Sequence, residues 1–215
     1  ALHVSNAEAP VILFFHGNGE IVADYNEIGF FYSQEGVNFL PIDYRGYGRS
    51  SGQPTVSAIM KDSHTVFHFC RNWLAENGFS GKLVVMGRSL GSACALEIAA
   101  SREKDIDGLI IESGFAQVLP LLRLLGIDPF SFGFVEEEGF QNLDKISAYN
   151  KPLLVIHGEY DHIIPYAEGQ ALFAACPSNR KAFLQIDRAD HNTILYFGLD
   201  EYLAGVKMFL EELNQ

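Results

Sequence analysis

The chain has 215 residues, of which 48% are hydrophobic and 20% charged, which fits one globular domain with a sizeable core and excludes a disordered chain. Its formal net charge is −12 at pH 7, with no basic cluster, and phosphate backbones would repel such a surface. Nucleic-acid binding is therefore not expected, and neither a transmembrane run nor a signal-peptide pattern is visible.

Six apolar runs alternate with segments of helical character. The runs are Val11 to Phe15, Val37 to Ile42, Leu83 to Met86, Leu109 to Ile111, Leu153 to Ile156 and Ala182 to Ile186. Most are apolar on both faces, which is typical of parallel strands covered by helices on both sides. Helices are predicted at about 24–35, 55–77, 89–101, 167–175 and 200–213. This order predicts an α/β fold, a three-layer α/β/α sandwich around a mostly parallel sheet.

Chemically reactive or glycine-rich motifs follow most of the predicted strands. In chain order they are His16-Gly17-Asn18-Gly19, Asp43-Tyr44-Arg45-Gly46-Tyr47-Gly48, Gly87-Arg88-Ser89-Leu90-Gly91, His157-Gly158-Glu159-Tyr160-Asp161 and Asp187-Arg188-Ala189-Asp190-His191. Ligands of open parallel sheets bind beyond the carboxyl ends of the strands. We therefore expect Ser89, Asp161 and His191 to meet at that edge of the sheet.

The segment around Ser89 is the most informative stretch. An apolar β-branched run precedes it and a helix-forming run follows, which is the context of a nucleophile elbow. Gly87 and Gly91 carry no side chains, so neighbouring backbone can approach the turn closely. We therefore predict that Ser89 is a catalytic nucleophile, which requires a base to take its proton.

His191 is the predicted base and Asp161 the predicted acid that orients it. The order serine, aspartate, histidine along the chain matches one of the known triad orders, and both partners follow strands. Glu112, at the end of another strand, is the rival acid. Glu159 is a weaker rival, and Asp190 is too close to His191 in sequence to reach its ring readily.

An oxyanion hole is the remaining requirement of acyl transfer, because backbone N–H groups must face the developing negative charge. The residue after the nucleophile, Leu90, is predicted to supply one of these groups. The loop after the first strand is predicted to supply the other, from Asn18, with its neighbour Gly19 as the alternative.

Residues 113–150 break the alternation, because this stretch is too long for one short helix and its loops. We predict a small cap or lid inserted within a single domain that spans 1–215. Its apolar side chains either shelter an acyl chain or pack the cap onto the sheet, and both readings stay open: Leu119, Leu121, Leu122, Leu125, Phe130, Phe132 and Phe134.

Taken together, the five motifs above resemble those of the α/β-hydrolase superfamily over essentially the whole chain. Within it, the chain is similar to the compact serine hydrolases that include acyl-protein depalmitoylases and lysophospholipid hydrolases. The resemblance implies esterase or thioesterase chemistry through an acyl-enzyme on Ser89. A serine peptidase of the same fold and a non-catalytic binding protein are the alternatives.

Two features depart from the family pattern. Only 1–10 precede the first predicted strand, where relatives carry further strands. Leu2-His3-Val4 is a candidate remnant of such a strand, so we expect either a fragment of a longer protein or a fold short at this edge. Arg88, beside the nucleophile, either steers anionic substrates or pairs with an acidic neighbour, and pairing is favoured.

The sequence also bears on cofactors, cellular location and partners. The sequence has neither a dinucleotide fingerprint nor a phosphate-binding loop nor a credible metal set, so no cofactor is expected, and His64 and His68 are assigned to an ordinary helix face. Three scattered cysteines, Cys70, Cys94 and Cys176, predict free thiols and a cytoplasmic location. The expected partner is a small ester or acyl substrate; membrane contact is possible but has no sequence support, and oligomeric state stays open.

Overall fold

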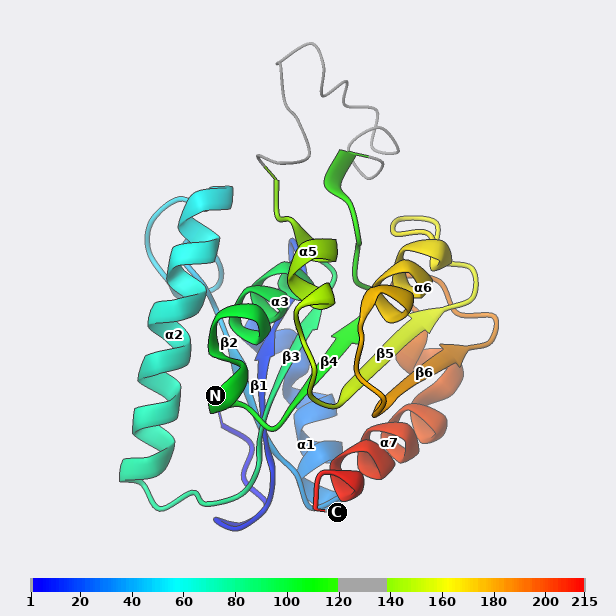
Figure 1. Cartoon of the computed structure of the whole chain (residues 1–215). Coiled ribbons are helices and arrows are strands. Elements are labelled where there is room, and N and C mark those ends of the chain that lie inside the picture. Colours follow the sequence, from blue (N-terminus) through cyan, green and yellow to red (C-terminus); the bar gives the residue numbers. More distant parts are fainter. Residues whose placement is uncertain (1, 120–138, 215) are drawn as a thin grey trace.

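A parallel sheet runs through the middle of the molecule, with helices packed on both of its faces (Figure 1). The computed structural model describes residues 2–119 and 139–214. The strands are β1 (Val11–Phe15), β2 (Asn38–Ile42), β3 (Leu83–Arg88), β4 (Gly108–Glu112), β5 (Leu153–Gly158) and β6 (Lys181–Ile186). They form a six-stranded sheet in the order β2-β1-β3-β4-β5-β6, and every neighbouring pair is parallel. The predicted α/β/α sandwich is confirmed.

The helices divide between the two faces of the sheet. The described elements are η1 (Val22–Tyr25), α1 (Asn26–Gln34), α2 (Val56–Glu76), α3 (Leu90–Arg102), η2 (Glu103–Asp105), α5 (Asn142–Ser147), α6 (Tyr166–Ala175) and α7 (Ile194–Glu212). Buried side chains of α1 and α7 share one core cluster, and those of α2, α3, α5 and α6 share another.

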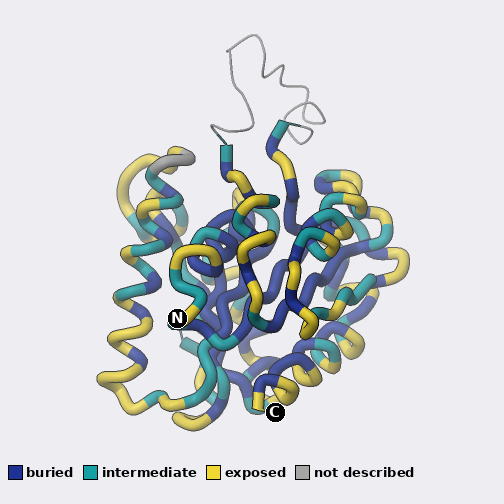
Figure 2. The backbone as a smooth tube through the Cα atoms, in the orientation of Figure 1, coloured by how far each residue is buried: buried dark blue, intermediate teal, exposed yellow. Residues whose placement is uncertain are grey.

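Alternation along the strands explains why two cores form. Successive side chains of a strand point to opposite faces. In β1, Ile12 and Phe14 belong to the core under α1 and α7, whereas Leu13 and Phe15 belong to the core under α2 and α3. All five residues of β1 are buried, as the continuous apolar run predicts (Figure 2).

Helix α7 begins earlier than the sequence predicts. It starts at Ile194 rather than near residue 200, and Gly198 interrupts it with non-helical backbone angles (φ −138°, ψ 34°). A Cβ at Gly198 would lie 2.6 Å from Cγ2 of Ile186, so the absence of a side chain lets the kinked helix pack against β6. A glycine inside a helical pattern weakens the helical prediction, so the sequence places the start of this helix beyond Gly198.

The edge of the sheet at β2 meets the N-terminal segment. His3 forms an antiparallel bridge with Phe39, with two backbone hydrogen bonds of 2.9 Å. The side-chain amide of Asn38 holds the same segment, because it accepts from the Ser5 N–H at 2.8 Å and donates to the Asn6 carbonyl at 2.7 Å. The strand-like pairing predicted around His3 is therefore present.

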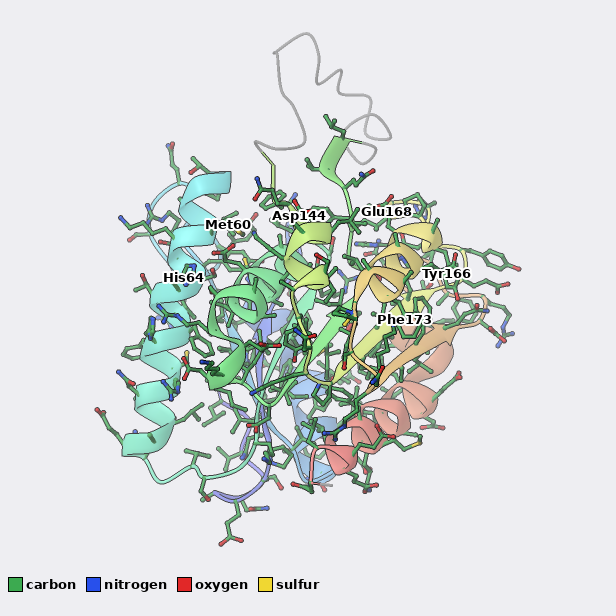
Figure 3. The ribbon with its side chains drawn as sticks, in the orientation of Figure 1. Met60, His64, Asp144, Tyr166, Glu168 and Phe173 are labelled. Atoms are coloured by element: carbon green, nitrogen blue, oxygen red, sulfur yellow. The ribbon has the colours of Figure 1, made fainter. Side chains whose placement is uncertain are left out.

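The base of the predicted cap is held by polar side chains. Glu168 lies on α6 (Figure 3). Its side chain accepts hydrogen bonds from the backbone N–H groups of Ala116 and Gln117 at 2.8 and 3.0 Å. Buried Asn142 donates to the Phe115 carbonyl at 2.8 Å, which joins the outgoing and returning parts of the insertion. Half of the predicted cap falls on 120–138, outside the described residues, and of the seven apolar side chains named for it in the sequence only Leu119 lies within them.

Candidate functional site

Ser89 lies at the turn between β3 and α3, with backbone angles of φ 52° and ψ −119°. A positive φ is rare for a residue with a side chain and marks a strained turn. A Cβ at Gly87 would lie 2.2 Å from the Gly91 carbonyl oxygen, and one at Gly91 would lie 2.0 Å from the Phe15 carbonyl oxygen. Both glycines are required by close backbone approach, so the local geometry is that of the predicted elbow.

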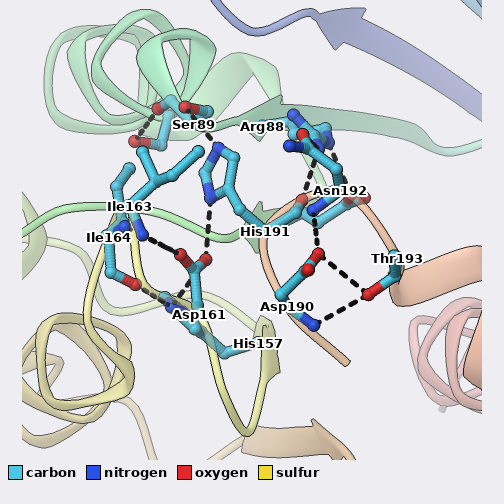
Figure 4. Close-up of polar contacts among 12 residues, drawn as sticks. Arg88, Ser89, His157, Asp161, Ile163, Ile164, Asp190, His191, Asn192 and Thr193 are labelled. Atoms are coloured by element: carbon cyan, nitrogen blue, oxygen red, sulfur yellow. Dashed lines mark hydrogen bonds and ion pairs between the residues drawn. The ribbon is translucent and has the colours of Figure 1, made fainter. Parts of the chain in front are cut away.

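Ser89, His191 and Asp161 lie within hydrogen-bond distance of one another in a chain of contacts (Figure 4). Nε2 of His191 is 3.0 Å from Oγ of Ser89, and Nδ1 of His191 is 2.7 Å from Oδ2 of Asp161. His191 and Asp161 are both buried. Three residues from three different strand ends therefore form the arrangement that the sequence predicts.

Asp161 is held in its ionised form by several donors. Its Oδ1 accepts from the N–H groups of Ile163 and Ile164 at 3.0 and 2.7 Å, while its Oδ2 faces His191 and, at 3.4 Å, Nε2 of His157. Burial alone would raise the pKa of this carboxyl, but the hydrogen bonds from His157, His191 and Ile164 outweigh it and lower the pKa well below 3.8. The charged form is thus available to orient His191.

His157 also contributes to the site, although the sequence predicts no catalytic role for it. It is fully buried, and its Nε2 also faces the Ile164 carbonyl at 2.9 Å. The turn of 161–164 is consequently held by two side chains: Asp161 binds its N–H groups, and His157 contacts the Ile164 carbonyl. Its position directly before Gly158 at a strand end, four residues ahead of Asp161, was the available signal.

The rival carboxylates are engaged elsewhere. Glu112 forms an ion pair with Nε of Arg88 at 3.0 Å and accepts from the Tyr202 hydroxyl at 2.8 Å. Glu159 accepts from the Arg188 N–H at 3.0 Å, and Asp190 accepts from the Asn192 N–H at 2.9 Å. Asp161 is therefore the acid that meets the imidazole of His191.

Arg88 pairs with two carboxylates, as favoured from the sequence. Its Nη1 contacts Glu20 and its Nε contacts Glu112, and the side chain is largely buried. Burial lowers the pKa of Arg88, but the charges of Glu112 and Glu20 outweigh this and raise it. Burial raises the pKa of Glu112, which the Arg88 cation and the Tyr202 hydroxyl only partly offset. Sequence reasoning named no partner for Arg88.

The predicted oxyanion donors border the same space as Ser89. Leu90 is the first residue of α3, so its N–H has no acceptor within the helix. Asn18 lies across the cleft, where its Oδ1 accepts from the Tyr47 hydroxyl at 2.7 Å. Gly19, the alternative to Asn18, has φ +80° and does not border this space.

A cleft of about 780 Å³ opens above Ser89 and His191. Its lining combines apolar side chains, called here the apolar part of the cleft, with polar side chains, called its polar part. The apolar part consists of Ile59, Leu90, Phe115, Val118, Phe140, Ile163 and Ile164. The polar part consists of Asn18, Glu20, Tyr47, Thr55, Arg88 and Asn192. A volume of this size accommodates a small organic molecule and offers it both apolar contact and hydrogen-bonding groups.

Two further histidines and the three cysteines have structural surroundings. Nε2 of His64 faces Glu97 at 2.7 Å, and Nε2 of His16 faces Asp43 at 3.1 Å. Among residues 2–119 and 139–214, no group of three or more His, Cys, Asp or Glu side chains is placed to hold a metal ion. The three cysteines, Cys70, Cys94 and Cys176, are buried and free. Within the same described ranges, no helix combines the length and apolarity needed to cross a bilayer.

Comparison with known proteins relates this chain to hydrolases. The family model described as serine aminopeptidase, S33, matches residues 6–129. Protein bem46 of Schizosaccharomyces pombe is 30% identical over 210 residues, which cover 94% of this chain and 68% of that protein. Alpha/beta hydrolase domain-containing protein 17B of Homo sapiens is 29% identical over 209 residues, which cover 94% of this chain and 66% of that protein. The chain spans about two thirds of the length of these curated relatives.

The overall architecture also matches solved structures. A monoacylglycerol lipase of Paleococcus ferrophilus superposes with a TM-score of 0.76 at 17% sequence identity. The superposition covers 99% of this chain and 98% of that one. At this identity the likeness shows the fold alone, and it extends over nearly the whole chain.

Proposed function

Since this chain belongs to the α/β-hydrolase family described as serine aminopeptidase, S33, and is thereby a hydrolase, we propose that it cleaves carboxylic esters or thioesters through an acyl-enzyme on Ser89. The observation that carries this proposal is the pair of contacts made by His191. Its Nε2 lies 3.0 Å from Ser89 Oγ, and its Nδ1 lies 2.7 Å from Asp161. These distances meet the requirement for a base within reach of the proton that it takes.

The proposed reaction has two halves. Ser89 Oγ attacks the carbonyl carbon of the substrate while Nε2 of His191 takes the hydroxyl proton, which forms a tetrahedral oxyanion. Collapse breaks the bond to the leaving alcohol or thiol, which receives that proton from His191, and leaves an acyl ester on Ser89. Water then attacks this ester with His191 again as base, and the carboxylic acid leaves as the serine hydroxyl is restored.

Asp161 and the backbone supply the electrostatic support. The ionised carboxylate of Asp161 holds the proton of His191 on Nδ1, so that Nε2 is free to accept the proton of Ser89. The N–H groups of Leu90 and Asn18 are proposed to face the oxyanion, because both residues border the cleft beside Ser89. Removal of one such donor in other enzymes typically costs roughly 10²–10³-fold in kcat.

The composition of the cleft supports an ester with an apolar acyl group. Its apolar side chains, among them Phe115, Phe140 and Ile163, offer a surface on which an acyl chain loses contact with water. The polar side chains of the cleft are then left for the alcohol or thiol portion.

A serine peptidase is the second candidate, because the family description names an aminopeptidase. An aminopeptidase needs an acidic group to hold the α-ammonium of its substrate. Among the described residues that line the cleft, Glu20 is the one carboxylate, and it is already engaged by Arg88, the Gly17 N–H and the Tyr25 hydroxyl. The arrangement therefore favours ester or thioester cleavage.

A fluorophosphonate probe tests the proposal, because it reacts with an activated serine without requiring the natural substrate. We expect labelling of the wild-type protein, loss of labelling in Ser89→Ala, and wild-type labelling in Ser147→Ala, which removes an exposed serine on α5. Kinetics on matched butyryl esters, butyryl thioesters and aminoacyl anilides then separate the candidates.

The outcomes are distinct. Turnover of the esters or thioesters without turnover of the anilides supports the proposal, whereas preferential cleavage of the anilides supports the peptidase. A folded wild-type protein that takes up no label contradicts the acyl-enzyme mechanism and favours the binding-protein alternative.

A further inference from the structure

Arg88 is buried next to the nucleophile, yet the proposed reaction gives it no chemical step. Replacing buried ion pairs by apolar side chains in other proteins is often neutral or stabilising, so stability alone is a weak reason to place a cation here. What distinguishes Arg88 is the set of partners that it holds, because they belong to the loops that carry the other functional groups.

The first set of contacts joins the elbow to the histidine loop. Nη2 of Arg88 donates to the backbone carbonyl of His191 at 2.6 Å and lies 3.4 Å from Oδ1 of Asn192. Arg88 is covalently next to Ser89, so the same short segment of chain carries the nucleophile and holds the main chain of its base. The carbonyl contact restrains the backbone from which the imidazole of His191 extends toward Ser89.

The second set joins the elbow to the loop that carries Asn18. Nη1 of Arg88 contacts Glu20 through one carboxylate oxygen, and the other oxygen of Glu20 accepts from the Gly17 N–H at 2.5 Å. A Cβ at Gly17 would lie 2.8 Å from that carboxylate, so the glycine is what permits the contact. The backbone on either side of Asn18 is thereby tied to Arg88.

The third set anchors the guanidinium itself. Nε of Arg88 pairs with Glu112 at 3.0 Å, Glu112 accepts from the Tyr202 hydroxyl at 2.8 Å, and the Tyr32 hydroxyl donates to that of Tyr202 at 3.0 Å. Glu112, Tyr202 and Tyr32 are all buried. A planar guanidinium with donors in fixed directions can serve these separate partners at once, which a single ammonium cannot.

We propose that Arg88 is a positioning residue that holds the elbow, the His191 loop and the Asn18 loop in fixed relative positions. The base, the nucleophile and the oxyanion donors that these segments carry thereby stay aligned for reaction. This inference rests on the proposed function, because it concerns the same site. Its consequence is kinetic: without Arg88 the protein still binds substrate, but the reacting atoms lose their alignment. A misplacement of about 1 Å in an active site can cost roughly 10²-fold in rate.

The test compares Arg88→Met and Arg88→Lys with wild type and with Arg71→Met. Arg71 pairs with Asp105 at 3.2 Å through a half-exposed side chain and lies outside the cleft, so it controls for loss of an ion pair. Three quantities are measured: the rate constant of fluorophosphonate labelling, the final labelled fraction, and kcat and KM on p-nitrophenyl butyrate. The final labelled fraction reports folded sites, and the rate constant reports their alignment.

For Arg88→Met we expect full final labelling at a rate roughly 10²-fold below wild type, with kcat reduced to match and KM changed by less than about twofold. Arg88→Lys retains the positive charge but not the planar guanidinium with its several N–H donors. We therefore expect stability near wild type and labelling at least about tenfold slower. This second variant keeps the test decisive should Arg88→Met fail to fold. Arg71→Met should label at the wild-type rate.

The positioning role is overturned if the wild-type protein is labelled and Arg88→Lys is labelled with the same rate constant. It is also overturned if the final labelled fraction of the Arg88 variants falls while their labelling rate constant is unchanged, because that pattern reports unfolding of part of the sample. A wild-type protein that does not label overturns the proposed function itself, and the positioning role with it. The behaviour of the wild type therefore distinguishes the two failures.

Discussion

Single residues at the site combine a strained backbone with fixed polar partners. Ser89 has a positive φ of 52°, and the surrounding turn holds it there through close backbone contacts at Gly87 and Gly91. Strain of this kind costs on the order of 1–3 kcal/mol and persists only where neighbouring structure enforces it. At Ser89 the strain has an evident use, because it presents Oγ to Nε2 of His191.

Asp161 gives a pH-dependent prediction at the scale of one residue. Burial opposes its ionisation, but donors from His157, His191 and the backbone outweigh burial, so its pKa in the folded protein is below the ordinary 3.8. A carboxyl whose pKa is lowered by folding stabilises the protein above the unfolded-state pKa, and this contribution disappears as pH falls toward the folded-state pKa. The contribution is on the order of 2 kcal/mol in comparable cases.

We therefore expect the difference in unfolding free energy between wild type and Asp161→Asn to shrink as pH is lowered from roughly pH 5 to pH 3. Urea titrations of both proteins across this range measure it. A difference that stays constant, or that grows as the pH falls, would contradict the assignment of Asp161 as an ionised, hydrogen-bonded carboxylate.

Among the elements, the junction of β1, β3 and α3 is the most constrained. The first turn of α3 passes so close to the end of β1 that a Cβ at Gly91 would lie 2.0 Å from the Phe15 carbonyl oxygen. The Phe15 carbonyl oxygen belongs to the backbone of a buried strand, which cannot move aside as a flexible side chain can. Packing at this junction therefore sets where α3, and with it Leu90, begins.

The substitution Gly91→Ala should accordingly destabilise the protein by roughly 1–3 kcal/mol and slow fluorophosphonate labelling, because α3 must shift to relieve the overlap. Thermal unfolding and labelling rates are the measurements. Gly78→Ala serves as the control, since Gly78 has a positive φ but open space around its Cβ position. It should lose some stability and keep the wild-type labelling rate; equal behaviour of the two variants would refute the packing argument.

At the scale of the whole molecule, the cleft exists because loops from several strand ends meet at one edge of the sheet. Residues after each of the six described strands border it, Tyr47 after β2 included, together with Ile59 on α2. Apart from Ile59, the side chains of its apolar part belong to or pack against a small separate core, in which the rings of Phe115 and Phe140 pack edge to face with centroids 5.4 Å apart. The cleft is thus a property of the assembled sheet.

Substrate preference provides the test at this scale. Ile163 lines the apolar part of the cleft and is only partly buried, so Ile163→Ala removes apolar contact with little disturbance of the core. If the variant loses about 1 kcal/mol of the free energy gained by burying the acyl chain, kcat/KM for an octanoyl ester falls roughly fivefold. The value for the acetyl ester should be unaffected, because its acyl group is too short to reach this contact. Parallel kinetics on the two esters check this, and an equal loss on both would place the acyl chain elsewhere.

Features that depend on neighbouring residues could be predicted from the amino-acid sequence alone. Continuous apolar runs predicted all six strands, and small residues around Ser89 predicted the turn that the structure contains. The order of Ser89, Asp161 and His191 at strand ends predicted their meeting, because parallel strands bring their carboxyl ends to one edge. The early start of α7 was missed where Gly198 weakens the local helical pattern.

The packing of the folded chain selects which distant groups become partners. Asp161 and Glu112 were rivals in the sequence, and packing sends the first to His191 and the second to Arg88 and Tyr202. The amino-acid sequence likewise does not predict the hydrogen bond between Arg88 and the His191 carbonyl, nor the approach of His157 to Asp161. Periodicity and turn chemistry are local, whereas a hydrogen bond between separate elements depends on their packing to within a fraction of an ångström.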